Sequence, residues 1–233
     1  MKDQRVPPSS CQPALSGRSA RATPALRQRS IIDATMRCIA RYSYSETTIE
    51  RICAEAKVSR GLINHHFQSK HELMAQTYKC LAADLLAASR AAAANAASPL
   101  EKLEASIKIC FAPPVFTTKN MKVWLGFWSV VHSDPVIRKA HKELYAGYRD
   151  ALKRLFDQIG AARMLPVASD LAALTLTAVI DGFWLEQARD PSSFSAEAAQ
   201  QGCLLVLASF LRDYGAAREV GLANRAAYID ADQ

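Results

Sequence analysis

Aromatic residues at helical spacing, together with one isolated acid, form a pattern in this sequence that suits a small-molecule site. Trp124, Phe127 and Trp128 are spaced i, i+3 and i+4, so they share roughly one face of a helix. Asp181 is the one charged residue in the apolar stretch 171–185. An organic cation binds to aromatic faces within about 6 Å and gains from a nearby carboxylate. The pattern therefore permits an aromatic cage for a cation.

Other residues extend this candidate site. Tyr145 and Tyr148 pair at i, i+3, and Asp134 is an alternative counter-ion to Asp181. The candidate ligand-binding residues are Trp124, Phe127, Trp128, Tyr145, Tyr148, Asp181 and Trp184. Two other interpretations stay open. Aromatic residues at helical spacing also build ordinary cores, and Asp181 can instead pair with a basic residue or bond across a dimer interface.

Motifs for catalysis and metal binding are absent from the sequence. Gly-x-Gly-x-x-Gly, Gly-x-Ser-x-Gly and His-Glu-x-x-His do not occur. Adjacent His65 and His66 would point about 100° apart on a helix, which does not suit a metal site with His71. The six cysteines form no Cys-x-x-Cys pair and indicate reduced, packed thiols, with a thiol sensor as the alternative. We expect no enzyme, no cofactor and no metal.

Composition indicates an all-helical, cytoplasmic protein. Half of the residues are apolar, Gly and Pro are scarce after residue 25, and no alternating strand pattern appears. The longest uncharged apolar run, 171–180, is shorter than the about 20 residues that a membrane span needs. No apolar secretory signal opens the chain.

The positive charge lies in the N-terminal part. Residues 1–94 contain 14 Lys and Arg against 7 Asp and Glu, whereas residues 95–233 contain 15 of each. A basic segment attached to a neutral body is typical of proteins that bind phosphate groups of nucleic acid.

Two short helical patterns meet within this basic part, in residues 47–67. Thr47 followed by Glu50 predicts a capping box at the start of the first helix, and Ser59 predicts the N-cap of the second. About three residues join them, from Lys57 to Ser59. This layout is typical of a helix-turn-helix, whose second helix enters the major groove of DNA.

The same signals place the remaining elements. We expect helices over about 24–42, 69–97, 98–113, 119–132, 134–162, 167–189 and 195–214, besides the two of the helix-turn-helix. The expected domains are a disordered basic arm at 1–23, a DNA-binding domain at 24–68, a ligand-binding and dimerisation domain at 69–215 and a loose tail at 216–233.

The helix-turn-helix and its flanks resemble the TetR family of bacterial repressors. The resemblance rests on Thr47-Thr48-Ile49-x-x-Ile52-x-x-x-Ala56-x-Val58-Ser59-Arg60-Gly61-x-Ile63-x-His65-x-Phe67-x-x-Lys70-x-x-Leu73. Lys57 and Ser43 stand where the family usually has glycine. Both positions are expected to need a left-handed backbone, which costs a non-glycine residue roughly 1 kcal/mol.

The resemblance implies a fold and a DNA-binding set. The fold is a three-helix DNA-binding domain followed by a helical bundle for ligand binding and dimerisation. The implied DNA-binding residues are Thr47, Thr48, Ser59, Arg60, Gly61, Leu62, Asn64, His65, His66 and Lys70. Arg60 and Asn64 can read guanine and adenine by paired hydrogen bonds, whereas Thr47, Thr48 and Lys70 would hold phosphates. Phe67 is expected in the core.

The second half is similar to a choline-responsive branch of the same family, which represses glycine betaine synthesis. The similar segments are Asn120-Met-Lys-Val-Trp-Leu-Gly-Phe-Trp128, His132-Ser-Asp-Pro135 and Asp181-Gly-Phe-Trp-Leu185, whereas Glu186 departs from that pattern. The resemblance implies a repressor that binds a palindromic operator as a homodimer through its last two helices and is released by choline. The alternative is a regulator of this family that senses another hydrophobic or cationic compound.

Overall fold

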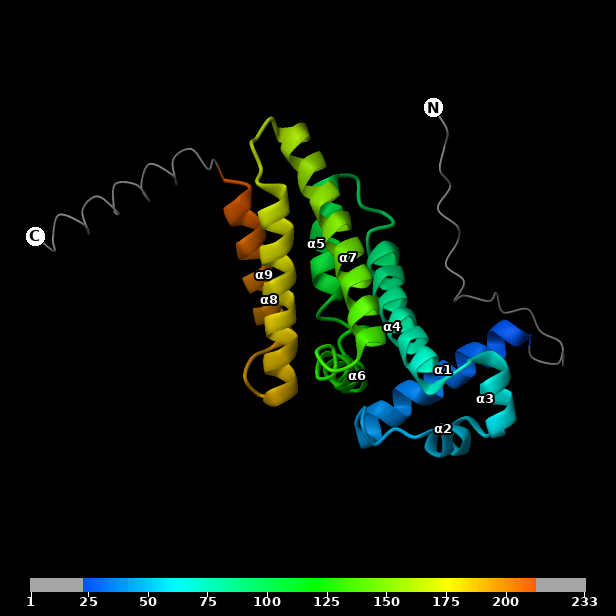
Figure 1. Ribbon diagram of the computed structural model, residues 1–233. Helices are drawn as coiled ribbons and strands as arrows, with labels where there is room; N and C mark the ends of the chain where they lie inside the picture. Colours follow the sequence, from blue (N-terminus) through cyan, green and yellow to red (C-terminus); the bar gives the residue numbers. More distant parts are fainter. Residues whose placement is uncertain (1–22, 213–233) are drawn as a thin grey trace, which may run out of the picture. The chain divides into compact units, whose positions relative to one another are not determined.

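A computed structural model describes residues 23–212, and over these residues the chain forms nine α-helices and no strand (Figure 1). The expected all-α class is therefore confirmed. The helices are α1 (Pro24–Tyr42), α2 (Ile49–Ala56), α3 (Arg60–His66), α4 (Lys70–Ala92), α5 (Pro99–Ile109), α6 (Thr118–Trp128), α7 (Pro135–Arg163), α8 (Ser169–Arg189) and α9 (Ala196–Phe210). The predicted tail and all but the last residue of the predicted arm lie outside the described residues.

Side-chain caps begin several helices at the predicted residue. The Ser59 hydroxyl accepts a hydrogen bond from the backbone N–H of Leu62 at 3.2 Å, which starts α3. The Ser98 hydroxyl does the same for Glu101 at 3.2 Å, at the start of α5. Such a cap satisfies one of the four backbone N–H groups that the first turn leaves without an intrahelical partner.

The start of α2 differs from the prediction by one residue. Thr48, not Thr47, is the N-cap, and its hydroxyl oxygen accepts from the N–H of Arg51 at 3.3 Å. Thr47 is fully buried and donates its hydroxyl to the Ser43 carbonyl at 2.6 Å. Both threonines have a hydroxyl that can cap a helix. In the turn after α1, however, the Thr47 hydroxyl bonds to the Ser43 carbonyl, so Thr48 serves as the cap.

Helices α4, α5 and α6 end four or five residues earlier than predicted, at Ala92, Ile109 and Trp128. The residue before a proline avoids helical backbone angles, so α5 cannot continue to Pro113, and residues 110–112 already bond three residues back instead of four. The alanines after Ala92 favour a helix by propensity, but a methyl group adds little packing to hold an extra turn.

Within residues 23–212, three non-glycine residues have positive φ: Ser43 (85°), Lys57 (55°) and Met164 (54°). The prediction for Ser43 and Lys57 is thus confirmed. Lys57 adopts the left-handed helical conformation and ends α2, with the N–H of Val58 bonded to the Cys53 carbonyl at 3.0 Å. This is the hydrogen-bond pattern that glycine usually serves at helix ends.

The described chain forms two compact units, one of residues 23–88 and 114–144 and one of residues 89–113 and 145–212. We call them the reading unit and the bundle unit. The reading unit is larger than the expected domain 24–68, because most of α4, all of α6 and the start of α7 belong to it. Helix α7 contributes to both units. Among the described residues, no helix combines the length and apolar character that crossing a membrane requires.

Helix α1 is the centre of the reading unit. The guanidinium of Arg29 donates to both carboxylate oxygens of Asp84 on α4, at 2.9 and 2.7 Å. Paired bonds of this kind fix orientation as well as distance. Helix α6 approaches α1 closely at Gly126, where an added Cβ would lie 2.9 Å from the Ile39 side chain. The helix-turn-helix therefore rests on a framework of α1, α4 and α6.

Candidate DNA-binding and ligand-binding sites

The exposed face of α3 carries most of the predicted DNA-binding side chains. Ile63 is 1% exposed and Phe67 1% exposed, which anchors the helix in the core of the reading unit and confirms that Phe67 is core. The residues on the opposite, exposed side are Ser59, Arg60, Gly61, Asn64 and His65. Leu62 and His66 are half-buried. The face thus presents two side chains that can make paired hydrogen bonds to bases.

Arg60 has a protein partner at this face. Its guanidinium donates to the Glu50 carboxylate at 3.1 Å, and both side chains are 69% exposed. The pKa of Glu50 is lowered by its own backbone N–H, by the Thr48 hydroxyl and by the charges of Arg60 and Lys70. An acid therefore lies beside three of the predicted DNA-binding residues, and sequence reasoning gave it only a helix-capping role.

Two predicted DNA-binding residues, Thr47 and His66, fit the structure less well. Thr47 is fully buried with its hydroxyl already bonded, so it is not available to DNA. The Nε2 atom of His66 is buried, and no hydrogen-bond partner for it lies among the described residues. Burial, with help from the charges of His65 and Arg27, lowers the pKa of His66. Its imidazole is therefore neutral at pH 7, and it adds no charge for phosphate.

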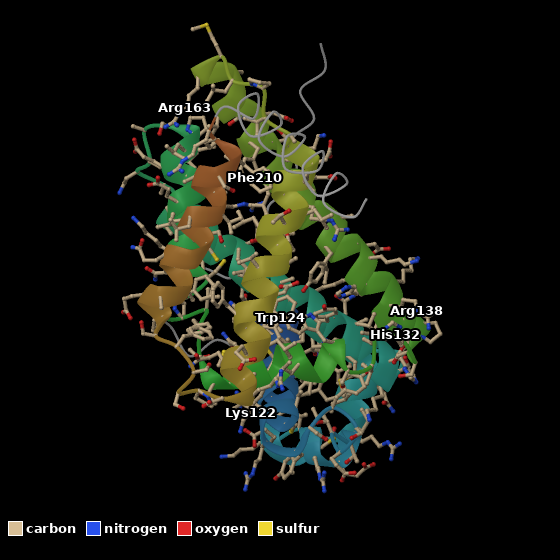
Figure 2. All side chains as sticks on the ribbon, turned by 90° about the vertical axis from the view of Figure 1, so that its left-hand side faces the viewer. Lys122, Trp124, His132, Arg138, Arg163 and Phe210 are labelled. Carbon is tan, nitrogen blue, oxygen red and sulfur yellow. The ribbon has the colours of Figure 1, made fainter. Side chains whose placement is uncertain are left out.

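Trp124 and Phe127 belong to an aromatic cluster inside the reading unit. Their rings lie 5.4 and 4.5 Å from that of Tyr78 on α4, and they are 6% and 0% exposed. Figure 2 labels Trp124, which lies on α6, together with His132 and Arg138, which lie before and within the first turns of α7. These contacts favour the interpretation of Trp124 and Phe127 as core.

Trp128 differs from these two aromatic residues. It is half-buried, with its ring 6.0 Å from that of Trp124. Its indole Nε1 is buried, and within the described part of the chain it has no hydrogen-bond acceptor. Buried indole N–H groups usually find a partner, so Trp128 is the member of this set that best fits a contact with a ligand.

Asp134 links three segments of the reading unit and is not free to act as a counter-ion. One carboxylate oxygen accepts from the backbone N–H groups of Val136 and Ile137, at 2.9 and 3.2 Å, and thereby caps α7. The other accepts from the Tyr44 hydroxyl at 3.3 Å and lies 3.1 Å from His71 Nδ1. We call these three side chains the Asp134 clamp: Tyr44, His71 and Asp134.

The clamp has a defined ionisation state. Burial disfavours the charged form of Asp134, but the N–H donors of α7 and the contact with His71 outweigh it and lower its pKa. Burial and the carboxylate of Asp134 raise the pKa of Tyr44 far above its ordinary value, so the phenol stays protonated as a donor.

In the bundle unit, Asp181 lies on α8 and receives a hydrogen bond from Tyr145 on α7. Burial raises its pKa to about 6, even though Tyr145 and the charge of Arg149 favour the carboxylate. A half-buried acid with such a pKa lacks full compensation for its charge. It would gain from a cationic ligand.

Tyr148 and Trp184 meet at Cys110, the C-cap residue that follows α5. The Trp184 indole donates to the Cys110 carbonyl at 3.1 Å, and Tyr148 is hydrogen-bonded to the Cys110 thiol. Burial raises the pKa of Cys110 to about 12. This thiol is therefore protonated and poorly reactive, which fits a packed side chain rather than a sensor.

The structure thus separates the predicted ligand-binding residues into two groups. Trp124, Phe127 and Trp128 belong to the reading unit, and the others belong to the bundle unit. Sequence reasoning missed Cys110 and Arg149 as neighbours of the second group. The spacing of Arg149, four residues after Tyr145 on one helix, was an available signal. Within residues 23–212 no three potential metal ligands lie together, and the five cysteines there are free thiols.

Two family models match the chain. The model of bacterial regulatory proteins of the tetR family covers residues 31–77, which contain the helix-turn-helix. The model of the C-terminal part of BetI-type transcriptional repressors covers residues 99–212.

Individual relatives agree with these models. The chain is 33% identical over 178 residues to the HTH-type transcriptional regulator BetI of Burkholderia thailandensis, which spans 75% of this chain and 88% of the relative. A transcriptional regulator of Pseudomonas aeruginosa superposes with a TM-score of 0.74 at 30% identity, over 81% of this chain and 92% of that one. A regulator from Saccharomonospora viridis, solved in complex with choline, superposes with a TM-score of 0.66 at 22% identity, over 76% and 92%.

These relatives are transcriptional regulators, in agreement with the expectation that the chain is not an enzyme. The chain belongs to the TetR family of bacterial transcriptional regulators and is a repressor of the BetI type.

Proposed function

We propose that this repressor acts in the cytoplasm as a homodimer that binds a palindromic operator through α3 and releases it when an organic cation, choline foremost, binds in the bundle unit. The observation that carries the choline part is Asp181, a half-buried acid within an apolar stretch of α8 whose pKa is raised by burial. The relative from Saccharomonospora viridis, solved with choline, supports the same ligand class.

The DNA part rests on the exposed face of α3. Arg60 and Asn64 lie there with free access to solvent, and Thr48 and Lys70 begin the helices on either side of α3. A seven-residue helix reads only a few base pairs, so it gives weak specificity alone. Two copies related by two-fold symmetry read a palindrome with half-sites about one turn apart.

The dimer part rests on an apolar stripe along α8. Its leucines Leu171, Leu174 and Leu185 are 48%, 51% and 44% exposed, and Leu205 on neighbouring α9 is 68% exposed. Gly182 leaves open space between these side chains, which allows the close approach of another helix. On α9, Leu205 is exposed whereas Leu207 is buried. A second copy of the chain is the occupant we propose.

Helix α7 contributes to both units and so connects the proposed DNA binding with the proposed ligand binding. Its first residues are capped by Asp134 of the clamp, and Tyr145 further along it bonds to Asp181. We propose that ligand binding at Asp181 displaces α7. This displacement would change the contacts of Asp134 with Tyr44 and His71, because Asp134 caps the start of α7. Coupling between two such sites typically amounts to 1–3 kcal/mol.

A different cation or amphipath is the second candidate effector. The observation that favours it is the packing of Trp124 and Phe127 against Tyr78, which removes two aromatic residues from the expected choline cage. The protein would still respond to a ligand at Asp181.

Titration with choline chloride tests the proposal. Tryptophan fluorescence and operator binding are followed together, with wild type, Asp181→Asn and the control Asp170→Asn, which removes an exposed acid from the same helix. We expect quenching and operator release for wild type and the control, and a loss of choline affinity of roughly tenfold or more for Asp181→Asn. An absence of any response to millimolar choline would eliminate choline, and a response equal in all three proteins would eliminate Asp181.

A further inference from the structure

Glu50 is an acid on the face that must approach a polyanion. It is the second residue of α2, and its side chain is 69% exposed beside the predicted DNA-binding residues Thr48, Arg60 and Lys70. A negative charge at this place opposes binding to phosphates. The proposed function therefore gives no reason for its presence, and its contacts must supply one.

The carboxylate lies at the first turn of α2, close to the groups that cap this helix. The Thr48 hydroxyl, which caps α2, and the Glu50 backbone N–H lower the pKa of this carboxylate and so favour its charged form. A carboxylate fixed at a helix N-terminus also interacts favourably with the helix dipole. The charged form is thus favoured by α2 itself as well as by Arg60.

Arg60 reaches this carboxylate from the other helix of the motif. The N–O distance is 3.1 Å, and helices α2 and α3 are in contact. Arginine has many rotamers, and an exposed guanidinium on a DNA-binding face otherwise moves to the nearest phosphate. A carboxylate partner restricts those rotamers and competes with phosphate for the guanidinium.

We propose that Glu50 is a specificity-determining residue that positions the Arg60 guanidinium for base reading and keeps it from binding phosphates without regard to sequence. This inference rests on the proposed DNA binding through α3. Glu50 acts through Arg60, so it is a positioning residue and not itself a base contact.

The matched control is Glu46. It is 67% exposed, lies four residues before Glu50 and pairs with Arg51 at 3.3 Å, so Glu46→Gln removes the same charge from the same segment without touching Arg60. Any effect of net charge alone is common to Glu46→Gln and Glu50→Gln. An effect on the position of the Arg60 guanidinium is expected only for Glu50→Gln.

The experiment measures the affinity of the full chain for two duplexes of equal length by fluorescence anisotropy. One carries the operator footprinted in the protein's own promoter region, and the other has a scrambled sequence. For Glu50→Gln we expect equal or tighter binding to the scrambled duplex and a roughly 5- to 100-fold fall in the operator-to-scrambled ratio, the range that one paired base contact supplies. For Glu46→Gln we expect that ratio to stay within about twofold of wild type.

A double-mutant cycle with Arg60→Lys, which keeps the charge but loses the planar fork, separates positioning from direct contact. If Glu50 acts through Arg60, the double variant loses no more discrimination than Arg60→Lys alone, within about twofold. Additive losses, or equal ratios for the two glutamate variants, would overturn the inference. Failure of the wild type to distinguish the two duplexes would instead refute the proposed function. Circular dichroism melts confirm that each variant is folded.

Discussion

Replacement of Asp134 by alanine should destabilise the protein by an amount that its contacts predict. The change removes the cap of α7, which costs about 1 kcal/mol for a typical N-cap residue. It also leaves the half-buried Tyr44 hydroxyl without this acceptor, which costs about 1–2 kcal/mol. The contact with His71 adds little, because that imidazole is 68% exposed. We therefore expect a loss of about 2–3 kcal/mol in the free energy of unfolding.

Thermal unfolding followed by circular dichroism measures this loss. For a chain of this size 1 kcal/mol corresponds to about 2–4 °C, so the midpoint should fall by roughly 4–12 °C. Asp134→Asn keeps a capping oxygen and Tyr44→Phe keeps the cap, so each should lose only about 1 kcal/mol.

The effect should depend on pH with a definite sign. Because the pKa of Asp134 is lowered in the folded protein, its contribution is complete above the ordinary carboxyl value of about 3.9 and is lost as the pH falls through the lower folded value. The difference between wild type and Asp134→Ala should be the same at pH 7 and pH 5 and shrink in stronger acid. A difference below about 0.5 kcal/mol at pH 7, or one that grows in acid, would refute this account of the clamp.

Three further predictions follow from single positions. Lys57→Gly should raise the midpoint by roughly 2–4 °C, because it relieves a left-handed residue worth about 1 kcal/mol, whereas Lys57→Ala should not. Asp181→Asn should stabilise the ligand-free protein by about 2–3 kcal/mol at pH 7.5, as measured by urea titration. The reason is that the wild-type protein loses stability as the pH rises from about 4 to about 6 and the buried Asp181 ionises. The gain should therefore vanish below about pH 4. Leu174→Arg should shift the protein toward monomer in analytical ultracentrifugation at micromolar concentration, whereas Leu86→Arg, at a 38% exposed leucine of α4, should not; equal effects of the two would argue against the α8 stripe.

The helices were predictable because their signals are local. A capping side chain bonds to a backbone N–H three residues ahead, so Ser59 and Ser98 mark helix starts without knowledge of the rest of the fold. Thr47 is a case in which local capping signals were not sufficient to predict the structure. It and Thr48 are chemically identical candidates, and the choice depends on the carbonyl of Ser43, which the turn after α1 brings within reach.

The ligand-binding set was harder to predict, because periodicity shows which residues share a face but not what that face meets. Trp124 and Phe127 meet Tyr78, a residue of α4 that no local pattern connects to α6. Cys110 enters the bundle-unit site only because α5 ends where Trp184 of α8 can bond to its carbonyl. The pairing of Asp134 with Tyr44 and His71 has the same origin in contacts between distant segments.

The central claim is that α3 reads an operator, and binding of the full chain to its own promoter region tests it most directly. Anisotropy titrations compare wild type with Arg60→Ala/Asn64→Ala, which truncates the two exposed side chains that can pair with bases. The account predicts tight, sequence-dependent binding by wild type and a loss of at least about 100-fold for the double variant, because each paired base contact supplies about 1–3 kcal/mol. Operator binding that survives the double replacement would contradict it.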